Sequence, residues 1–417
     1  MPLNKHTLHL IGAIASGILL SLAVAVPAQQ APRPAPRPPR PLPSPTPGVT
    51  PGAPFGGPLA GLTALELAAF ADGFDEFTNV ETPEGGKLGP IFNGKSCSEC
   101  HTAGGIGGSS TTTVTRFGRS EQGHFDALDA LGGSLLQKFA TTPELQERVP
   151  AEANVVAQRQ STALFGLGLI EAISDAAIAQ NARDPKPDGI RGKAAMVFDP
   201  ASNTLRVGRF GWKSQIANLT TFAGDAYSNE MGVTNRFFPL ENAPNGNRSL
   251  LLKFQPNPEV EDQIDPATGK SDIDLAADFM RLLAPATPLP STPASRQGEA
   301  VFAQIGCASC HKPSMTTGQS PIAALHRKPV NLYSDLLLHD MGTLGDGIAQ
   351  GDAGVREMRT APLWGLHVRT RFLHDGRAAT LDEAVRGHAG TAGVSRDRYQ
   401  KLPPPARQQL LDFLATL

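Results

Sequence analysis

Apolar side chains recur at intervals of three and four residues in two stretches of the chain. The two series are Leu67, Phe70, Phe74 and Phe77, and Leu410, Phe413, Leu414 and Leu417. Such spacing places the side chains on one face of a helix, so we predict a helix in each stretch. The pattern also predicts a helix from residue 155 to about residue 178, and a short helix that starts near Ser295. Strand signals are short throughout, and we therefore expect a mainly α protein with long loops.

The beginning of the chain has a different pattern. Lys5 precedes an apolar run over residues 10–26, and small residues follow as far as Ala28. A basic start, an apolar middle and small residues at the end predict a secretory signal peptide over residues 1–28, cut after Ala28 or, alternatively, after Ala25. An uncleaved membrane anchor is the other interpretation, because the run approaches the ~20 residues that a membrane span needs.

Residues 29–58 contain 12 prolines in 30 positions. Such a segment has little apolar surface to bury and favours an extended backbone, so we predict a disordered linker. No later apolar run is long enough to cross a bilayer, and we expect no membrane span after signal cleavage. The sequence thus predicts an exported protein, which we expect in the periplasm of a Gram-negative bacterium.

Length and charge narrow the possible functions. A chain of 417 residues is long enough for two domains after its N-terminal segment is set aside. Lys and Arg number 37 against 39 Asp and Glu, which gives a formal net charge of −2. Nucleic-acid binding usually needs a basic surface, and we expect no nucleic-acid partner.

The four cysteines carry the clearest chemistry. They occur in Cys97-Ser-Glu-Cys100-His101 and in Cys307-Ala-Ser-Cys310-His311, two copies of the pattern C-x-x-C-H. Two thiols at this spacing can each bond one vinyl group of the same porphyrin, and the adjacent histidine can ligate the iron. We therefore expect two covalently bound haem c groups, with His101 and His311 as the proximal ligands. Two disulfides are one alternative, but they would ignore both histidines. Zinc is another, but the two pairs are 210 residues apart and each is followed by histidine.

Five further runs carry a family resemblance. They are Phe165-Gly-Leu-Gly-Leu-Ile-Glu-Ala-Ile173, Arg209-Phe-Gly-Trp-Lys213, Asp335-Leu-Leu-Leu-His-Asp-Met-Gly342, Phe372-Leu-His-Asp-Gly-Arg377 and Thr380-Leu-Asp-Glu-Ala-Val-Arg-Gly-His388. With the haem motifs, they resemble the bacterial di-haem oxidoreductase family, which is related to the di-haem cytochrome c peroxidases. The resemblance implies two fused cytochrome c-like domains, an enlarged one over residues 59–286 and a smaller one over residues 287–417.

The resemblance also implies a second ligand for the C-terminal iron. In the related peroxidases, a Thr-Leu-Glu-x-Ala-Val segment places a methionine ligand eight positions after its threonine. Here that position after Thr380 is His388, which implies a haem held by His311 and His388. Two imidazoles favour ferric iron more than an imidazole and a thioether do, so the potential would be lower. Met341, Met358 or Tyr399 could ligate instead.

For the N-terminal haem, the resemblance points to Glu171 as a catalytic acid and base. A carboxylate beside an open iron could move a proton between the two oxygens of peroxide. A surface residue, or an ion pair with Arg159, is the alternative role for Glu171. His124 could be a reversible second ligand, although a solvated loop residue is the simpler interpretation.

Several residues have softer predicted roles. Trp212 could lie near a haem edge or pack in the core. Arg209 and Lys213 could pair with haem propionates. Thr360-Ala-Pro362 resembles the Thr-x-Pro that supplies oxygen ligands to calcium in the related peroxidases, which gives a possible Ca²⁺ site.

Together these features predict an enzyme that reduces peroxide, or binds oxygen, at an open His101 haem. Electrons would come through the His311/His388 haem from a small redox protein or an organic donor. A non-catalytic di-haem electron-transfer cytochrome is one alternative. An oxygenase or oxidase that uses the same open haem is another.

Overall fold

The computed structural model describes residues 55–84, 87–254 and 260–417, which belong to one compact unit. The predicted signal peptide and residues 29–54 of the predicted linker lie outside these residues. The last linker residues are described, and Phe55 and Pro58 form β-bridges with Gly105 and Leu283. In the described part of the chain, no helix has the length and apolar character that a membrane crossing requires.

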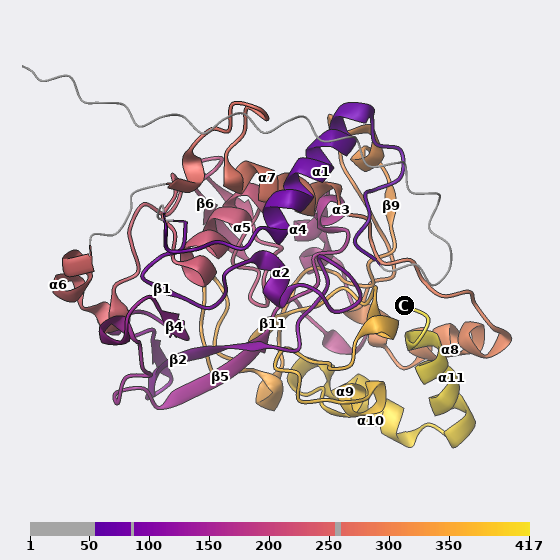
Figure 1. Cartoon of the computed structure of the whole chain (residues 1–417). Helices are drawn as coiled ribbons and strands as arrows, with labels where there is room; N and C mark the ends of the chain where they lie inside the picture. The colour runs from indigo at the N-terminus through magenta and orange to yellow at the C-terminus, as the bar shows by residue number, and fades with distance from the viewer. Residues whose placement is uncertain (1–54, 85–86, 255–259) are drawn as a thin grey trace, which may run out of the picture. The chain divides into compact units, whose positions relative to one another are not determined.

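Helices dominate the described chain, as the sequence predicts (Figure 1). The α-helices are α1 (Ala64–Thr78), α2 (Cys97–Cys100), α3 (Leu167–Glu171), α4 (Asp175–Arg183), α5 (Leu219–Ala226), α6 (Arg248–Leu251), α7 (Asp272–Leu282), α8 (Pro293–Gln304), α9 (Leu381–Arg386), α10 (Gly393–Lys401) and α11 (Pro404–Leu414). A π-helical turn, Tyr227–Met231, directly continues α5.

The strands are short and form small antiparallel sheets. They are β1 (Ile91–Phe92), β2 (Thr113–Glu121), β3 (His124–Asp126), β4 (Phe139–Ala140), β5 (Val155–Gln160), β6 (Met196–Asp199), β7 (Thr204–Val207), β8 (Met315–Thr316), β9 (Pro329–Val330), β10 (Leu338–Asp340) and β11 (Glu357–Arg359). The largest described sheet has the order β3-β2-β5, and the others are the pairs β1-β4, β6-β7, β8-β9 and β10-β11.

Two helix pairs repeat the same arrangement around the two C-x-x-C-H motifs. The helix before the first motif, α1, packs against α7, and the helix before the second motif, α8, packs against α11. A glycine lies at each crossing: a Cβ on Gly73 would be 2.4 Å from the Leu275 carbonyl oxygen, and one on Gly298 would be 1.8 Å from that of Gln409. Glycine therefore permits both close approaches. The predicted packing of the C-terminal helix across the helix before the second motif is confirmed.

The predicted helix from residue 155 to about residue 178 is wrong. Its first part is β5, which pairs with β2 and whose side chains from Val155 to Gln158 alternate between half-buried and exposed. Neighbouring β-branched valines at the start of the segment suit a strand better than a helix. Gly166, with a φ of +68°, then turns the chain into α3, and the Ser174 side chain caps α4 by accepting from the Ala177 amide.

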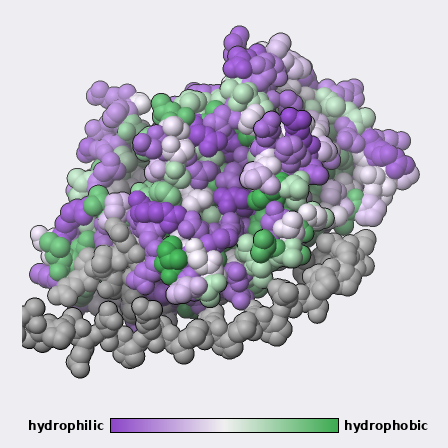
Figure 2. Space-filling model, turned by 90° about the horizontal axis from the view of Figure 1, so that it is seen from above, coloured by the Kyte–Doolittle hydropathy of each residue, from purple (hydrophilic) through white to green (hydrophobic). Residues whose placement is uncertain are grey.

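Two clusters of apolar side chains form the main core. The smaller cluster draws on α8, α9, α10 and α11 and includes Phe302, Tyr399 and Phe413. The larger one joins the helices of the N-terminal half to later residues, including Met315 and Trp364. Residues beyond 287 thus contribute to both clusters, and the predicted domain boundary there stays a prediction. Figure 2 shows a face of the molecule that is mostly hydrophilic, with small separate hydrophobic patches.

Candidate haem sites

The first C-x-x-C-H motif forms a short helix that ends at its histidine. The Ser96 hydroxyl accepts a hydrogen bond from the Ser98 amide and caps α2. His101 follows this helix, and its Nδ1 donates to the Gly108 carbonyl oxygen at 3.0 Å. Burial lowers the pKa of His101 to about 4. The imidazole is therefore neutral at physiological pH, and its Nε2 is left to ligate a metal.

A cavity opens beside this motif. Cys97, Cys100 and His101 line it together with residues of α5 and of the π-helical turn after it. Burial raises the pKa of the Cys97 thiol to about 12 and that of Cys100 to about 11. All four cysteines of the chain are free, so the disulfide alternative finds no support in this geometry. The zinc alternative stays open at the second motif, where Cys310, Asp335 and His339 lie close together.

Buried guanidinium groups in the cavity fit the anionic side of a haem. Arg116 and Arg159 both line it, and each has a buried nitrogen without a hydrogen-bond partner among the described residues, Nε of Arg116 and Nη2 of Arg159. Burial lowers the pKa of Arg116 to about 10, and this group is still a cation at pH 7. Arg159 forms an ion pair with Asp346 through its Nε at 2.7 Å, but a buried nitrogen without a hydrogen-bond partner is costly, and a porphyrin carboxylate would satisfy it. The cavity therefore fits a haem propionate.

Two carboxyl groups line the same cavity. Glu230 lies in the π-helical turn, where its Oε2 accepts from the Asn93 side chain at 2.9 Å. Asp225 lies in α5, and its Oδ1 accepts from the Asn229 side chain at 2.9 Å. Burial raises the pKa of Glu230 and raises that of Asp225 to about 6. Carboxyl groups whose pKa is raised in this way are suited to donate and accept protons at this cavity.

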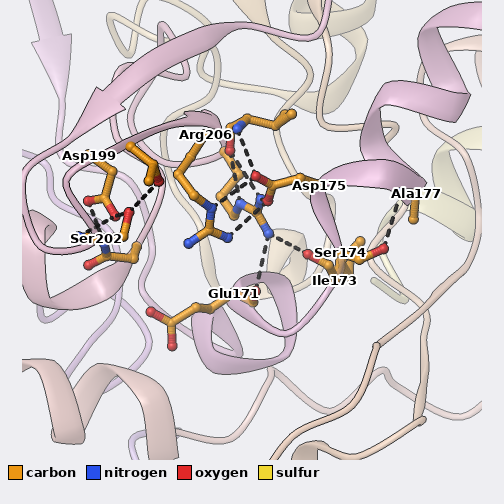
Figure 3. Close-up of polar contacts among 12 residues, drawn as sticks. Glu171, Ile173, Ser174, Asp175, Ala177, Asp199, Ser202 and Arg206 are labelled. Carbon is orange, nitrogen blue, oxygen red and sulfur yellow. Dashed lines mark hydrogen bonds and ion pairs between the residues drawn. The ribbon is translucent and has the colours of Figure 1, made fainter.

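Glu171 does not line this cavity. Its carboxylate forms an ion pair with Arg281 at 2.7 Å, and Oε1 also accepts from the Leu219 amide at the start of α5. Figure 3 shows the main chain of Glu171 beside the ion pair of Asp175 and Arg206, whereas its carboxylate points away from that pair. The contacts give Glu171 a structural role that joins α3, α5 and α7. Its catalytic role stays a prediction without structural support.

The second C-x-x-C-H motif lies beside a cavity that holds two candidate ligand histidines, His311 and His388. His311 donates from Nδ1 to the Tyr333 carbonyl oxygen at 3.0 Å, and His388 donates from Nδ1 to that of Ala384 at 2.8 Å. Both histidines line one cavity together with Cys307 and Cys310, and their ring centroids are 6.4 Å apart. Burial lowers the pKa of both imidazoles. The Nε2 atom of each neutral ring is therefore free to ligate an iron between them.

The methionine alternatives also lie beside the second cavity. Met341 and Met358 line it, whereas Tyr399 is fully buried in the smaller core cluster and donates from Oη to Asp382 at 2.6 Å. His339 lies beside the motif, 3.8 Å from the Cys310 sulfur, and is held by Asp335 at 2.9 Å. The sequence gives His339 no ligand role, and its ion pair with Asp335 agrees with a structural one.

Trp212 connects the two cavities. It lines both of them, and its Nε1 donates to the Gln160 carbonyl oxygen at 2.7 Å. The sequence predicts that its neighbours Arg209 and Lys213 pair with haem propionates, but neither side chain lines either of these cavities. Arg209 pairs with Asp175, and Lys213 pairs with Asp346 at 3.0 Å. Both side chains are fully buried in these ion pairs and are unavailable to a propionate.

The remaining residues with a predicted role are His124 and the possible calcium ligands Thr360 and Pro362, and none of them lines the first cavity. His124 is exposed in β3, opposite Glu121 of β2. Thr360 and Pro362 line the second cavity. The Thr360 carbonyl oxygen accepts from the Ser334 hydroxyl at 2.6 Å and from the Arg359 guanidinium at 3.3 Å. A guanidinium on that oxygen opposes a cation there, and the calcium site stays a prediction.

The sequence alone does not predict the residues outside the motif that line the first cavity. Glu230 and Asp225 are not adjacent in sequence to either C-x-x-C-H motif, and Arg116 lies in β2. One signal was present, because the run Glu230-Met-Gly-Val-Thr-Asn-Arg236 follows the Arg209 run in the sequence. The spacing alone does not tell which carboxyl group reaches the cavity.

Comparisons with known proteins assign the chain to a family. The model of the family described as "Di-haem oxidoreductase, putative peroxidase" matches residues 138–417, a segment that contains the second haem motif but not the first. None of the curated proteins matches the chain.

Solved structures give weak likenesses. The diheme peroxidase BthA from Burkholderia thailandensis is 14% identical over 84% of this chain and 86% of that one, with a TM-score of 0.38. A Kuenenia stuttgartiensis hydrazine synthase chain is 15% identical over 90% and 99%, with a TM-score of 0.35. A MauG-like protein associated with microbial copper homeostasis is 16% identical over 65% and 92%, with a TM-score of 0.30. At these TM-scores we base nothing on the likenesses.

Proposed function

Because this chain belongs to the di-haem oxidoreductase family, we propose that it is an exported enzyme that reduces peroxide beside His101. Two covalently bound haem c groups serve the reaction, one on each C-x-x-C-H motif. Membership of the family makes haem the cofactor, and the two motifs support covalent attachment of both groups. The signal-peptide pattern supports export, because it precedes the cytochrome-like body.

The contrast between the two cavities carries the proposal. His101 is the one histidine that lines the first cavity among the described residues, and Asp225 and Glu230 line it as well. The second cavity instead holds His311 and His388 at a separation that suits one iron between them. An iron with an open position can bind a small oxidant, whereas an iron held by two imidazoles is suited to electron transfer. The first site is therefore the reactive one.

Glu230 supplies the proton chemistry. A haem iron, when bound, supplies a site for the oxidant and electrons for its reduction. Reduction of hydrogen peroxide needs two electrons and two protons and yields two waters. The Glu230 carboxyl can take up a proton and pass it to the oxygen that leaves as water, and Asp225 can supply the next proton from the α5 side. Asn93, in the connection between β1 and α2, holds the Glu230 carboxyl in place through a hydrogen bond.

Electrons enter through the second site. Trp212 lines both cavities, so its indole offers a contact path between the two haem positions. The donor is a small redox protein or an organic reductant. The formal net charge of −2 gives no strong electrostatic preference for either.

A non-catalytic electron carrier is the second candidate. Met231 and Met280 also line the first cavity, and a thioether from either would close the iron to oxidants. An oxidase or oxygenase would use the open iron in the same way as a peroxidase, with oxygen as the substrate. The rates at which peroxide and oxygen oxidise the reduced protein separate these three.

Anaerobic titration of the fully reduced, haem-loaded protein with hydrogen peroxide tests the function. Each peroxide takes two electrons, so we expect one equivalent to oxidise both haem groups of one chain. Fast oxidation by oxygen with slow oxidation by peroxide would replace the peroxidase with the oxidase. Slow oxidation by both would leave the electron carrier.

A further inference from the structure

Three carboxylates from separate parts of the chain converge behind the first cavity. They belong to Glu76 near the end of α1, Glu261 in the turn before α7, and Asp272 in the first turn of α7. One oxygen of each lies within 4.8 Å of the other two. The residues come from sequence positions almost 200 apart, and α1 packs on α7 at this place (Figure 1). The fold itself gathers these negative charges.

Glu261 is the unusual member of this cluster. Its side chain is 0% exposed, and neither of its carboxylate oxygens has a hydrogen-bond partner among the described residues. Its oxygen nevertheless lies against those of Glu76 and Asp272. A buried carboxyl group with no partner is costly, unless a proton or a cation compensates for it. The cluster therefore lacks a component that neutralises Glu261.

The neighbouring groups do not supply that component. Lys87 is the nearby cation, and its Nζ is bonded to the Asp272 carboxylate at 3.1 Å. Glu81, which is also buried, adds a further acidic group, and its Oε1 accepts from the Asn79 side chain. Four carboxyl groups thus face one ammonium group. Tyr227 donates from Oη to Glu76 at 2.6 Å but brings no charge.

We propose that Glu76, Glu261 and Asp272 bind a calcium ion. The cluster offers only carboxylate oxygens, which are the ligands of hard divalent cations. Calcium takes several carboxylate oxygens of the protein directly, whereas magnesium usually keeps several waters and binds only one or two carboxylates. A cluster of three carboxylates therefore suits calcium.

The ion would fasten three segments together beside the first cavity. Glu76 belongs to α1, which precedes the first haem motif, and Asp272 begins the helix that crosses it. Tyr227, bonded to Glu76, lines the first cavity. Calcium at this cluster therefore supports the wall of the His101 cavity. The site is distinct from Thr360 and Pro362, which line the second cavity.

Calcium binding to the haem-loaded protein tests the proposal. The protein is dialysed against a chelator, then titrated with CaCl₂ by calorimetry, and its melting temperature is followed by circular dichroism. We expect binding of one Ca²⁺ and a rise in melting temperature that grows with calcium concentration. Glu261→Gln should weaken the affinity at least about tenfold and remove the rise. Glu152→Gln, at an exposed glutamate, is the matched control and should behave as the original protein.

Three results would overturn the proposal. The first is a chelated original protein that neither binds nor is stabilised by millimolar CaCl₂, which would mean that protons neutralise the cluster. The second is Glu261→Gln with unchanged calcium affinity. The third is equal affinity for MgCl₂ and CaCl₂, because a site of three carboxylates suits calcium and not magnesium. If Glu261→Gln fails to fold, Asp272→Asn at the edge of the cluster takes its place, with the same expected loss of affinity.

Discussion

The imidazole rings of His311 and His388 face one another with centroids 6.4 Å apart and planes inclined by 62°. A metal–imidazole bond is about 2 Å long, and a ring centre lies about 1 Å beyond its nitrogen, so two rings on one iron have centres roughly 6 Å apart. The hydrogen bonds of both Nδ1 atoms to backbone carbonyls leave the two Nε2 atoms for that iron. This relationship supports the prediction of a bis-histidine haem from the position of His388.

Replacing His388 by methionine should raise the potential of the second haem. A thioether stabilises ferrous iron relative to an imidazole, and we expect a rise on the order of 0.1 V within the ~0.8 V that axial ligands span. Redox titration followed by visible absorption measures it. His326→Met changes an exposed histidine outside the cavity and should leave both potentials unchanged. An unaltered potential in His388→Met would show that another residue holds the iron.

Replacing Glu230 by glutamine should slow peroxide reduction by about 10²–10⁴-fold in kcat/KM, which is the usual contribution of a positioned acid or base. Glutamine keeps the size of the side chain but cannot release a proton. Steady-state consumption of peroxide with a reduced small cytochrome as donor measures the change. Haem content and melting temperature should stay close to those of the original protein.

Glu171→Gln is the comparison that separates the two glutamates. We expect near-normal activity and a free energy of unfolding that falls by about 1–3 kcal/mol, because Arg281 loses a charged partner. Denaturant unfolding followed by circular dichroism measures this loss. A large loss of activity in Glu171→Gln with normal activity in Glu230→Gln would restore the role that the sequence assigns to Glu171.

The stability of the fold should depend on pH through Glu241. Burial raises the pKa of its carboxyl to about 7, and its Oε2 is buried without a described partner. The folded state therefore favours the protonated form, which stabilises the fold fully below about pH 4.5 and ceases to do so as the pH rises through about 7. Glu241→Gln should raise the free energy of unfolding at pH 8 by up to about 3 kcal/mol.

The same substitution should have almost no effect at pH 4.5, where the original carboxyl is protonated in the folded state. Urea unfolding at both pH values provides the comparison. An equal change in unfolding free energy at both would mean that the effect comes from packing and not from ionisation.

Replacing Arg159 by methionine should lower the potential of the first haem. Arg159 lines the first cavity with a free buried Nη2, and loss of a nearby cation favours the more positive ferric iron. Arg159 also pairs with Asp346, so Arg119→Met, at a surface ion pair with Asp126, controls for general loss of charge. Potentiometry should show the shift in the first haem only. A change in the potential of the second haem alone would contradict the position of Arg159 beside the first haem.

The sequence predicts the helices whose apolar spacing is long and regular. The series ending at Phe77 and the series from Leu410 to Leu417 both appear as helices, α1 and α11. The helix predicted to begin at residue 155 is wrong because pairing with β2 overrides the helical spacing of the apolar residues there. Local spacing does not report on such a partner 40 residues earlier in the chain.

The candidate site divides in the same way. The C-x-x-C-H motifs are predictable because their chemistry depends on short spacing within one segment, whereas His388 is implied only by the family resemblance of the run that begins at Thr380. Glu230 and Arg116 reach the first cavity only through tertiary packing, so their roles need the structure. Glu171 was favoured by its place in a family-like run, but its carboxylate meets Arg281, a residue 110 positions later.

The open first haem is the central claim, and electron paramagnetic resonance of the oxidised, haem-loaded protein tests it most directly. The account predicts one high-spin ferric signal that becomes low-spin when cyanide is added, together with one low-spin signal that cyanide does not change. The unchanged signal should belong to the His311/His388 haem and should be altered in His388→Met. Two low-spin signals that cyanide leaves unchanged, in the oxidised and the half-reduced protein, would contradict the account and make the protein an electron carrier.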